Sequence, residues 1–348
     1  MSITDSSTSG GIGRIETIID PQSDKIAVIE LSTRAVKLLV GNDPNALRRG
    51  SFDFRLFTRQ SVRTDTGYGL TPDGYMDMDY FCDRVMPAIT GARRSASHML
   101  CGRVYTVATA AYRMAKNREE LLEAIRREAG LNVHILSRDE EAMGAISAYQ
   151  FTTANRAELF RHSRHIMADQ GGASTEVSVF DNGECAQSQS IDVGTEWLKR
   201  IVMSCARDGA SLMRALREAK DELEQAAAPL LDAMPEPVAD GAMCIGVGSA
   251  ITRATGLIGS PAQHDKVLTL EHIENTLADA TDRLTARYVM AADLCQAFGR
   301  DRQADELLTM VLGLPFYAML LRNQNLTALT VSGTGLWYGI YYQQLLGL

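Results

Sequence analysis

The order of short apolar segments along this chain constrains its fold more than any other feature of the sequence. Three segments in the first half predict strands, because they are apolar or alternate in polarity: Ile26–Leu31, Ala35–Gly41 and Phe52–Val62. The second half repeats this order, with strands predicted at His165–Asp169, Thr175–Phe180 and Cys185–Ser190. A helical pattern follows each set. The repetition predicts two copies of one α/β unit, and two facing copies would enclose a ligand-binding cleft.

Further strands and helices are predicted around these two sets. Strands are expected at Val104–Ala108, Val133–Leu136, Met243–Val247 and Ala328–Val331, and helices at Asn117–Ala129, at Glu140–Tyr149, after Met78, after Asp192 and from Gly335. A length of 348 residues suggests two domains. We expect a flexible tail over residues 1–24, a first domain over 25–145 and a second domain with additional helices over 146–348. An edge strand at Ile15–Ile19 is the alternative within the tail.

The turn between the first two strands of each set carries polar residues suited to anion binding. The first turn contains Glu30, Ser32, Thr33 and Arg34, and the second contains Asp169, Gly171, Gly172, Ser174, Thr175 and Glu176. Successive backbone amides in such turns can converge on an anion. A carboxylate at a strand end can hold Mg²⁺ together with phosphate and water. Each turn alone is also compatible with a plain hairpin, but their matching places in a repeated fold favour a shared phosphate site.

A third acidic segment, Ser137–Ala142, lies between a predicted strand and a predicted helix. Acidic residues in the first turn of a helix interact favourably with the helix dipole, which explains them without any function. The functional alternative is that Glu141 lies at the mouth of the cleft and acts as a general base on water.

The composition narrows the classes of partner. With 35 Lys and Arg against 43 Asp and Glu, the net charge is −8, so a broad cationic face for nucleic acid is excluded. Uncharged apolar runs fall short of the roughly 20 residues of a membrane span, so no membrane is expected as a partner. The six cysteines contain no C-x-x-C pair, and the N-terminal segment has no signal-peptide pattern. These features predict reduced thiols and a cytoplasmic location.

Five segments together resemble the exopolyphosphatase / guanosine pentaphosphate phosphohydrolase (Ppx/GppA) family. They are Val107–Asn117 (VATAAYRMAKN), Ser137–Ala142 (SRDEEA), Asp169–Glu176 (DQGGASTE), Gly246–Ser249 (GVGS) and Ser332–Gly339 (SGTGLWYG), in the family's order. The resemblance extends from about Ala27 to the C-terminus. It implies an α/β fold of two actin-like domains, in the ribonuclease H-like, sugar kinase and Hsp70 superfamily, with an interdomain cleft.

The resemblance also implies an activity and roles for individual residues. It implies a hydrolase that releases the terminal phosphate of inorganic polyphosphate or guanosine pentaphosphate, with Mg²⁺ or another divalent cation, and that forms a homodimer. Guanosine tetraphosphate is a further implied ligand. Glu141 matches the glutamate that activates the attacking water, and Arg113 matches an arginine that faces the anionic cleft. The residues expected to bind phosphate are Ser32, Thr33, Arg34, Lys37, Gly171, Gly172, Ser174, Thr175, Gly248 and Ser249, and those expected to hold the metal are Asp169, Glu176 and Glu30.

The first turn departs from the family's pattern I-D-L-G-S-N-S. Glu30 lengthens the acid, Ser32 replaces a glycine and Arg34 replaces a small amide, while Trp337 stands where the family usually has arginine. A serine tolerates a left-handed backbone less well than glycine, although an arginine can donate directly to a phosphate. These changes leave two alternatives to a hydrolase: a catalytically weakened regulatory protein of the same fold that binds nucleotide or polyphosphate, and a kinase of that fold.

Overall fold

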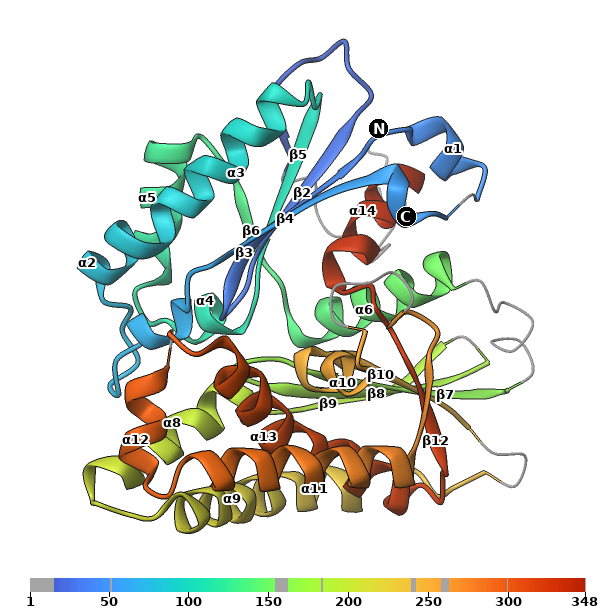
Figure 1. Cartoon of the computed structure of the whole chain (residues 1–348). Helices are drawn as coiled ribbons and strands as arrows, with labels where there is room; N and C mark the ends of the chain where they lie inside the picture. The colour runs from blue at the N-terminus through green and yellow to red at the C-terminus, as the bar shows by residue number, and fades with distance from the viewer. Residues whose placement is uncertain are drawn as a thin grey trace, which may run out of the picture.

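The computed structural model describes residues 16–50, 52–153, 162–182, 184–238, 242–257, 263–298 and 300–347. Within these residues the chain forms two six-stranded sheets, each flanked by helices, and one sheet lies above the other in Figure 1. The first 15 residues of the expected N-terminal tail lie outside the described part of the chain.

The first sheet is a mixed sheet. Its strands are β1 (Glu16–Ile18), β2 (Ile26–Leu31), β3 (Ala35–Gly41), β4 (Phe57–Arg63), β5 (Arg103–Ala108) and β6 (Val133–Ile135). Strands β2, β3 and β4 form an antiparallel meander, β5 lies parallel to β2, and both β1 and β6 pair with β5. The helices of this half are α1 (Pro44–Arg48), α2 (Met78–Tyr80), α3 (Met86–His98), α4 (Ala110–Met114) and α5 (Arg118–Ala129).

The second sheet repeats this topology. Its strands are β7 (Arg164–Gln170), β8 (Thr175–Asp181), β9 (Glu184–Ile191), β10 (Met243–Gly248), β11 (Val267–Thr269) and β12 (Ala328–Val331). Strands β7, β8 and β9 form the second meander, and β10 lies parallel to β7 as β5 does to β2. The helices are α8 (Thr195–Arg207), α9 (Leu212–Asp232), α10 (Ser249–Ala254), α11 (Leu270–Arg287), α12 (Ala291–Ala297) and α13 (Arg302–Asn323). The structural repeat expected from the sequence is therefore present.

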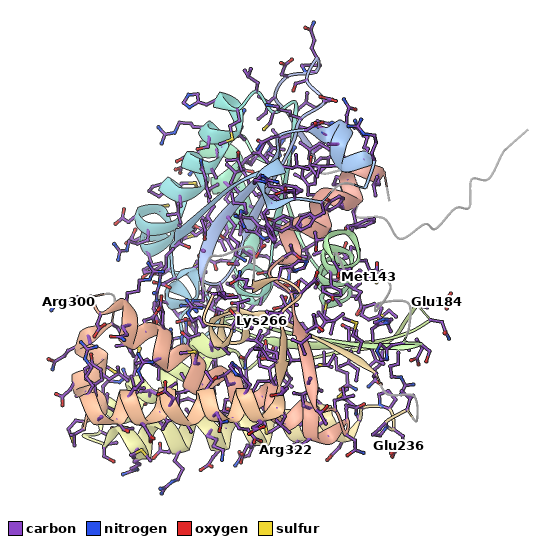
Figure 2. All side chains as sticks on the ribbon, turned by 45° about the vertical axis from the view of Figure 1, so that its right-hand side comes forward. Met143, Glu184, Glu236, Lys266, Arg300 and Arg322 are labelled. Atoms are coloured by element: carbon purple, nitrogen blue, oxygen red, sulfur yellow. The ribbon has the colours of Figure 1, made fainter. Side chains whose placement is uncertain are left out.

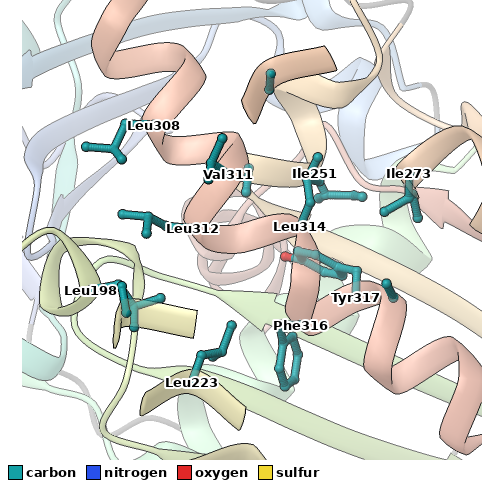
Figure 3. Packing of buried hydrophobic residues seen from close by; sticks show 14 of the residues in the cluster. Leu198, Leu223, Ile251, Ile273, Leu308, Val311, Leu312, Leu314, Phe316 and Tyr317 are labelled. Carbon is teal, nitrogen blue, oxygen red and sulfur yellow. The ribbon is translucent and has the colours of Figure 1, made fainter. Parts of the chain in front are cut away.

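Helix α13 forms the centre of the core of the second domain. Its side chains Leu312, Phe316 and Tyr317 pack among apolar residues of α8, α9 and α10 (Figure 3). By length and composition alone α13 could cross a membrane, but 83% of its most apolar window is buried inside the protein. Charged side chains such as Glu184, Glu236 and Arg322 lie on the outside of this domain (Figure 2).

Two helices, α6 (Arg138–Thr152) and α14 (Leu336–Leu346), lie between the two sheets (Figure 1). They approach so closely that a Cβ on Gly339 would lie 1.8 Å from the carbonyl oxygen of Gly144. The aromatic residues of α14, including Tyr341, pack against residues of β2 and β3. The C-terminal helix, which the expected boundaries assign to the second domain, therefore packs on the sheet of the first.

Two segments differ from the sequence expectation. Residues 54–56 of the predicted strand Phe52–Val62 form a 3₁₀ turn, because the Asp53 carboxylate accepts a hydrogen bond from the amide of Arg55 at 2.8 Å and β4 begins only after that turn. Residues Glu16–Ile18, expected within a flexible tail, pair with β5 as the antiparallel strand β1. This strand corresponds to the alternative considered for Ile15–Ile19, of which Ile15 is not described.

Candidate active site

A cleft of about 800 Å³ lies between the two domains. It is lined by the β2–β3 turn, the β7–β8 turn, the β10–α10 junction and the N-terminal ends of α6, α13 and α14. The residues of the sequence prediction that line it are Glu30, Ser32, Thr33, Arg34, Lys37, Glu141, Asp169, Gly171, Gly172, Ser174, Glu176, Gly248 and Ser249. Arg113 reaches this group through a hydrogen bond to Glu141.

In the first turn, Glu30 on β2 lies opposite Lys37 on β3. The Nζ of Lys37 is 2.6 Å from Glu30 Oε1, and it also lies over the ring of Trp337, 5.7 Å from the centroid. The second carboxylate oxygen of Glu30 is buried and has no hydrogen-bond partner among the described residues. Ser32 closes the turn, since its hydroxyl donates to the carbonyl of Ala35 at 2.9 Å. The charges of Glu30 and Lys37 therefore largely cancel, and one carboxylate oxygen of Glu30 remains unpaired.

Arg34, at the tip of the same turn, crosses the cleft to the second domain. Its Nε lies 2.9 Å from Glu196 Oε1 on α8, its Nη2 lies 3.5 Å from Asp305 on α13, and its Nη1 donates to Ser249 Oγ at 3.2 Å. Asp305 also pairs with Arg63 of β4 at 2.9 Å and with the buried Lys199 at 2.7 Å. Burial of these groups strengthens their mutual attraction. Arg34, expected to donate to phosphate, is thus part of an ionic network that joins the two domains.

In the second turn, two acids lie opposite each other, Asp169 on β7 and Glu176 on β8. The turn between them closes through a hydrogen bond from the amide of Gly171 to the carbonyl of Ser174 at 2.9 Å. The amides of Gly172 and Ala173 donate to no backbone carbonyl among the described residues, and both residues line the cleft. Such amides suit an anionic oxygen.

Thr175 differs from its neighbours in this turn. Its side chain is fully buried, and its hydroxyl donates to the carbonyl of Val193 at 2.7 Å. It does not line the cleft. Thr175 was expected to bind phosphate, but its side chain instead holds the turn against the segment that precedes α8.

At the start of α6 two adjacent glutamates have different surroundings. Glu140 forms a capping box with Ser137, because the Ser137 amide donates to Glu140 Oε2 at 2.7 Å and the Ser137 hydroxyl accepts from the Glu140 amide. Glu141 instead faces the cleft and accepts a hydrogen bond from Nη1 of Arg113. The same nitrogen donates to the carbonyl of Leu136 at 2.7 Å, which fixes the guanidinium. Stabilisation of the helix start therefore explains Glu140, whereas the carboxylate of Glu141 takes no part in capping and faces the cleft.

Three carboxyl groups of the cleft have raised pKa values. Burial raises the pKa of Glu141 to about 7 against the opposing effect of Arg113, and the charges of Asp169 and Glu30 add to the rise. Burial and the facing Glu176 raise the pKa of Asp169 to about 7. Burial and Glu141 likewise raise the pKa of Glu176 to about 7. Acids whose pKa values are raised by burial and by each other are typical of functional sites.

Between these three acids lies a small cavity of about 20 Å³, which is otherwise lined by Ser178 and by the apolar residues Ala142, Ala145, Met167 and Leu336. A volume of this size holds one water molecule when polar partners are available, and three carboxyl groups supply them. The cavity is therefore suited to a water molecule within reach of Glu141.

The same acids fit a divalent cation. Among the described residues, no three His, Cys, Asp or Glu side chains lie together so that they could hold a metal ion. Mg²⁺ does not require three such side chains, because it is usually held by one or two carboxylates and completes its shell with water and substrate phosphate. Asp169 and Glu176 supply such carboxylates, and Glu30 lines the same cleft. A cation here would relieve the repulsion that raises their pKa values.

The cleft also contains a group of arginines that was not predicted from the sequence. Arg63, Arg253 and Arg302 line it, together with the acids Asp305 and Glu306. Arg253 follows Ser249 by four residues in α10, so helical spacing places both on one face. That spacing was the available signal for Arg253, whereas only the tertiary structure brings Arg63 and Arg302 to the cleft.

Comparison with known proteins gives a consistent result. The model of the Ppx/GppA phosphatase family matches residues 49–347. The chain is 22% identical over 240 residues to a guanosine-5'-triphosphate,3'-diphosphate pyrophosphatase of Aeromonas salmonicida, covering 69% of this chain and 44% of that protein. It is 27% identical over 184 residues to exopolyphosphatase 1 of Mycobacterium tuberculosis, covering 50% of this chain and 49% of that protein. The chain thus spans about half the length of the curated relatives it matches.

Solved structures match over more of the chain. The crystal structure of the Aquifex aeolicus Ppx/GppA family member has a TM-score of 0.69 at 20% identity, covering 93% of this chain and 98% of that one. An exopolyphosphatase from Cytophaga hutchinsonii has a TM-score of 0.68 at 18% identity, covering 93% and 99%. The expected α/β fold, with two sheets of repeated topology, is confirmed by this likeness.

Proposed function

The chain belongs to the Ppx/GppA phosphatase family, and on that premise we propose that it hydrolyses phosphoanhydride bonds in the interdomain cleft. Its substrate is a chain of linked phosphates, either inorganic polyphosphate or guanosine pentaphosphate, from which it releases the terminal phosphate. Matched relatives are named for reactions of this kind. The observation that carries the proposal is the convergence of Glu141, Asp169 and Glu176 on a water-sized cavity beside an anion-binding turn.

The terminal phosphate binds at the β7–β8 turn in this proposal. The amides of Gly172 and Ala173 and the hydroxyl of Ser174 line the cleft there. Asp169 and Glu176 would hold Mg²⁺ or another divalent cation, with water and substrate phosphate completing its shell. When bound, the cation neutralises phosphate charge that would otherwise repel these acids.

Glu141 is the general base. Its pKa of about 7 lets its carboxylate accept a proton from water at neutral pH. As the water oxygen bonds to the terminal phosphorus, the proton passes to Glu141 and the phosphoanhydride bond breaks, its electron pair leaving with the shortened chain. Arg113 holds the carboxylate in place, because its guanidinium is anchored to the carbonyl of Leu136. Phosphoryl transfer depends mainly on such positioning and charge stabilisation.

Phosphate release from polyphosphate and from guanosine pentaphosphate, measured side by side with Mg²⁺ and with a chelator, tests the proposal. We expect release from at least one of the two with Mg²⁺ and a large loss of rate with the chelator. No release from either substrate over hours would overturn it.

One observation favours a second function, a regulatory protein that binds nucleotide or polyphosphate without turnover. Arg34 stands where the family has a small amide, and its guanidinium pairs with Glu196 and Asp305 across the cleft. Calorimetry that shows tight binding of guanosine pentaphosphate or polyphosphate, together with no released phosphate, would favour this function over hydrolysis.

A further inference from the structure

Arg253 is a cation of the cleft that the proposed reaction does not use. Its Nη1 donates to the carbonyl of Ser249 at 2.9 Å, which fixes the guanidinium one turn along α10. Its Nε is buried without a hydrogen-bond partner, and no carboxylate of the described residues lies within 4.0 Å of it. A buried donor without a partner is costly and indicates that something else satisfies it.

The charges around Arg253 leave this end of the cleft positive. Asp305 is shared by Arg34, Arg63 and Lys199, and Glu306 pairs with Arg302 at 2.8 Å. Burial and the nearby Arg34 lower the pKa of Arg253, although it stays protonated at neutral pH. The acids here are therefore already paired with other cations, and an anion in the cleft would gain from the charge of Arg253.

The position of Arg253 relative to the reacting phosphate follows from the sheet. Val247 lies beside Asp169, and Gly248 beside Gln170, in the parallel register of β10 and β7. Ser249 therefore begins α10 next to the β7–β8 turn, and Arg253 lies one helical turn, roughly 6 Å, further along. The cleft is thus acidic where the terminal phosphate would react and basic one helical turn away.

We propose that Arg253, with Arg34 and the hydroxyl of Ser249, forms a second anion subsite that binds a phosphate group other than the one released. Arg34 Nη1 and the Ser249 hydroxyl are already joined by a hydrogen bond of 3.2 Å, so the three groups form one continuous surface. The subsite selects phosphate chains over single phosphate groups. Which end of the bound phosphate chain lies at the β7–β8 turn rests on the proposed function, whereas the binding of a phosphate chain in the cleft does not.

Calorimetry on the Glu141→Gln protein with Mg²⁺ tests the subsite, with orthophosphate, inorganic tripolyphosphate and GTP as probes. We expect Arg253→Gln to weaken tripolyphosphate binding about tenfold, because a charge-assisted hydrogen bond is lost, and to leave orthophosphate binding unchanged. Weaker GTP binding in the same variant would extend the subsite to nucleotides, and unchanged GTP binding would restrict it to inorganic chains. The matched control is Arg283→Gln, which removes an exposed arginine paired with Asp279 on α11.

Arg253→Lys provides a second variant if Arg253→Gln does not fold. It keeps the charge but loses the guanidinium fork, so tripolyphosphate should bind a few-fold more weakly and orthophosphate as before. Unchanged tripolyphosphate affinity, or equal weakening for orthophosphate and tripolyphosphate, would overturn the subsite. If the unmodified protein releases no phosphate but Arg253→Gln still weakens tripolyphosphate binding, the proposed hydrolysis fails and the subsite stands.

Discussion

Asp169 lies directly opposite Glu176 across the β7–β8 hairpin, so two carboxyl groups share one wall of the cleft. The corresponding hairpin of the first domain places Glu30 opposite Lys37, an acid opposite a cation. The two halves therefore share a topology but differ in charge. Charge repulsion is concentrated on the side of the second domain, and a metal ion would stabilise that side most.

This repulsion predicts a pH dependence of stability. The pKa of Asp169 is about 7 in the folded protein, above its ordinary value of 3.8. Between about pH 4 and pH 7 the native state therefore holds a proton that the unfolded chain has released, so the free energy of unfolding falls as the pH rises across this window. Without divalent cations, Asp169→Asn should stabilise the protein at pH 8 by roughly 2–4 kcal/mol and at pH 5 by less than half of that, because only part of the loss has accumulated there.

Urea unfolding in a chelating buffer from pH 5 to pH 8 measures this effect. The control is Glu184→Gln, which changes an exposed acid on β9 and should leave the pH dependence as it is. At pH 8, Mg²⁺ should raise the free energy of unfolding of the unmodified protein more than it raises that of the Asp169→Asn variant. Equal pH profiles for Asp169→Asn and the unmodified protein would show that Asp169 does not carry the repulsion.

The interdomain network predicts that Arg34 contributes to stability. Arg34→Asn leaves the buried Glu196 and Asp305 with one cation fewer. Lys199 still pairs with both acids and Arg63 still pairs with Asp305, so neither carboxylate is left alone. We expect a loss of about 2 kcal/mol in the free energy of unfolding, less than the removal of an isolated buried pair would cost.

Denaturant unfolding of Arg34→Asn should be compared with Arg283→Asn. The second variant removes an exposed ion pair on α11, with 3.2 Å between Arg283 and Asp279, and should cost at most about 0.5 kcal/mol. A loss for Arg34→Asn no larger than that for Arg283→Asn would mean that the network does not hold the domains together.

The contact between α6 and α14 predicts strong sensitivity to one methyl group. A Cβ at position 339 would lie 1.8 Å from the carbonyl oxygen of Gly144, which is backbone and cannot move aside alone. Gly339→Ala should therefore destabilise the protein by about 3 kcal/mol. Gly91→Ala in α3 is the matched control, because nothing lies within 4 Å of its added Cβ.

Thermal unfolding of these two variants separates close packing from helix propensity. Gly91→Ala should be neutral or slightly stabilising, since alanine favours helix over glycine. If Gly339→Ala unfolded at the same temperature as the unmodified protein, the helices would have to pack less closely than described.

The sequence predicted the strands of the fold well because burial in a sheet requires apolar residues in short, separate runs. The predicted bounds Ile26–Leu31, Ala35–Gly41 and Ala328–Val331 agree with β2, β3 and β12. The return of α14 to the first sheet was not predicted, because an apolar helix indicates that it is buried but not against which sheet. The 3₁₀ turn before β4 was also not predicted, because it depends on a local hydrogen bond to Asp53 that the pattern of apolar residues does not show.

The site was predictable where the chemistry is local and not where it depends on tertiary contacts. Both turns and Glu141 carry their signal in a few adjacent residues. Arg34 was expected to contact phosphate, which stays a prediction; its acidic partners Glu196 and Asp305 could not be predicted because they come from distant helices. The fully buried Thr175 lies next to Ser174, and only the fold shows which of the two faces the cleft.

Phosphate release by Glu141→Gln tests the central claim most directly. The amide keeps the size of the side chain but cannot accept a proton from water, so we expect at least a hundredfold slower release from the better substrate. Binding of the same substrate should remain within a few-fold, because the amides and cations of the cleft are unchanged. A Glu141→Gln protein that releases phosphate at the rate of the unmodified protein would contradict the assignment of Glu141 as the base.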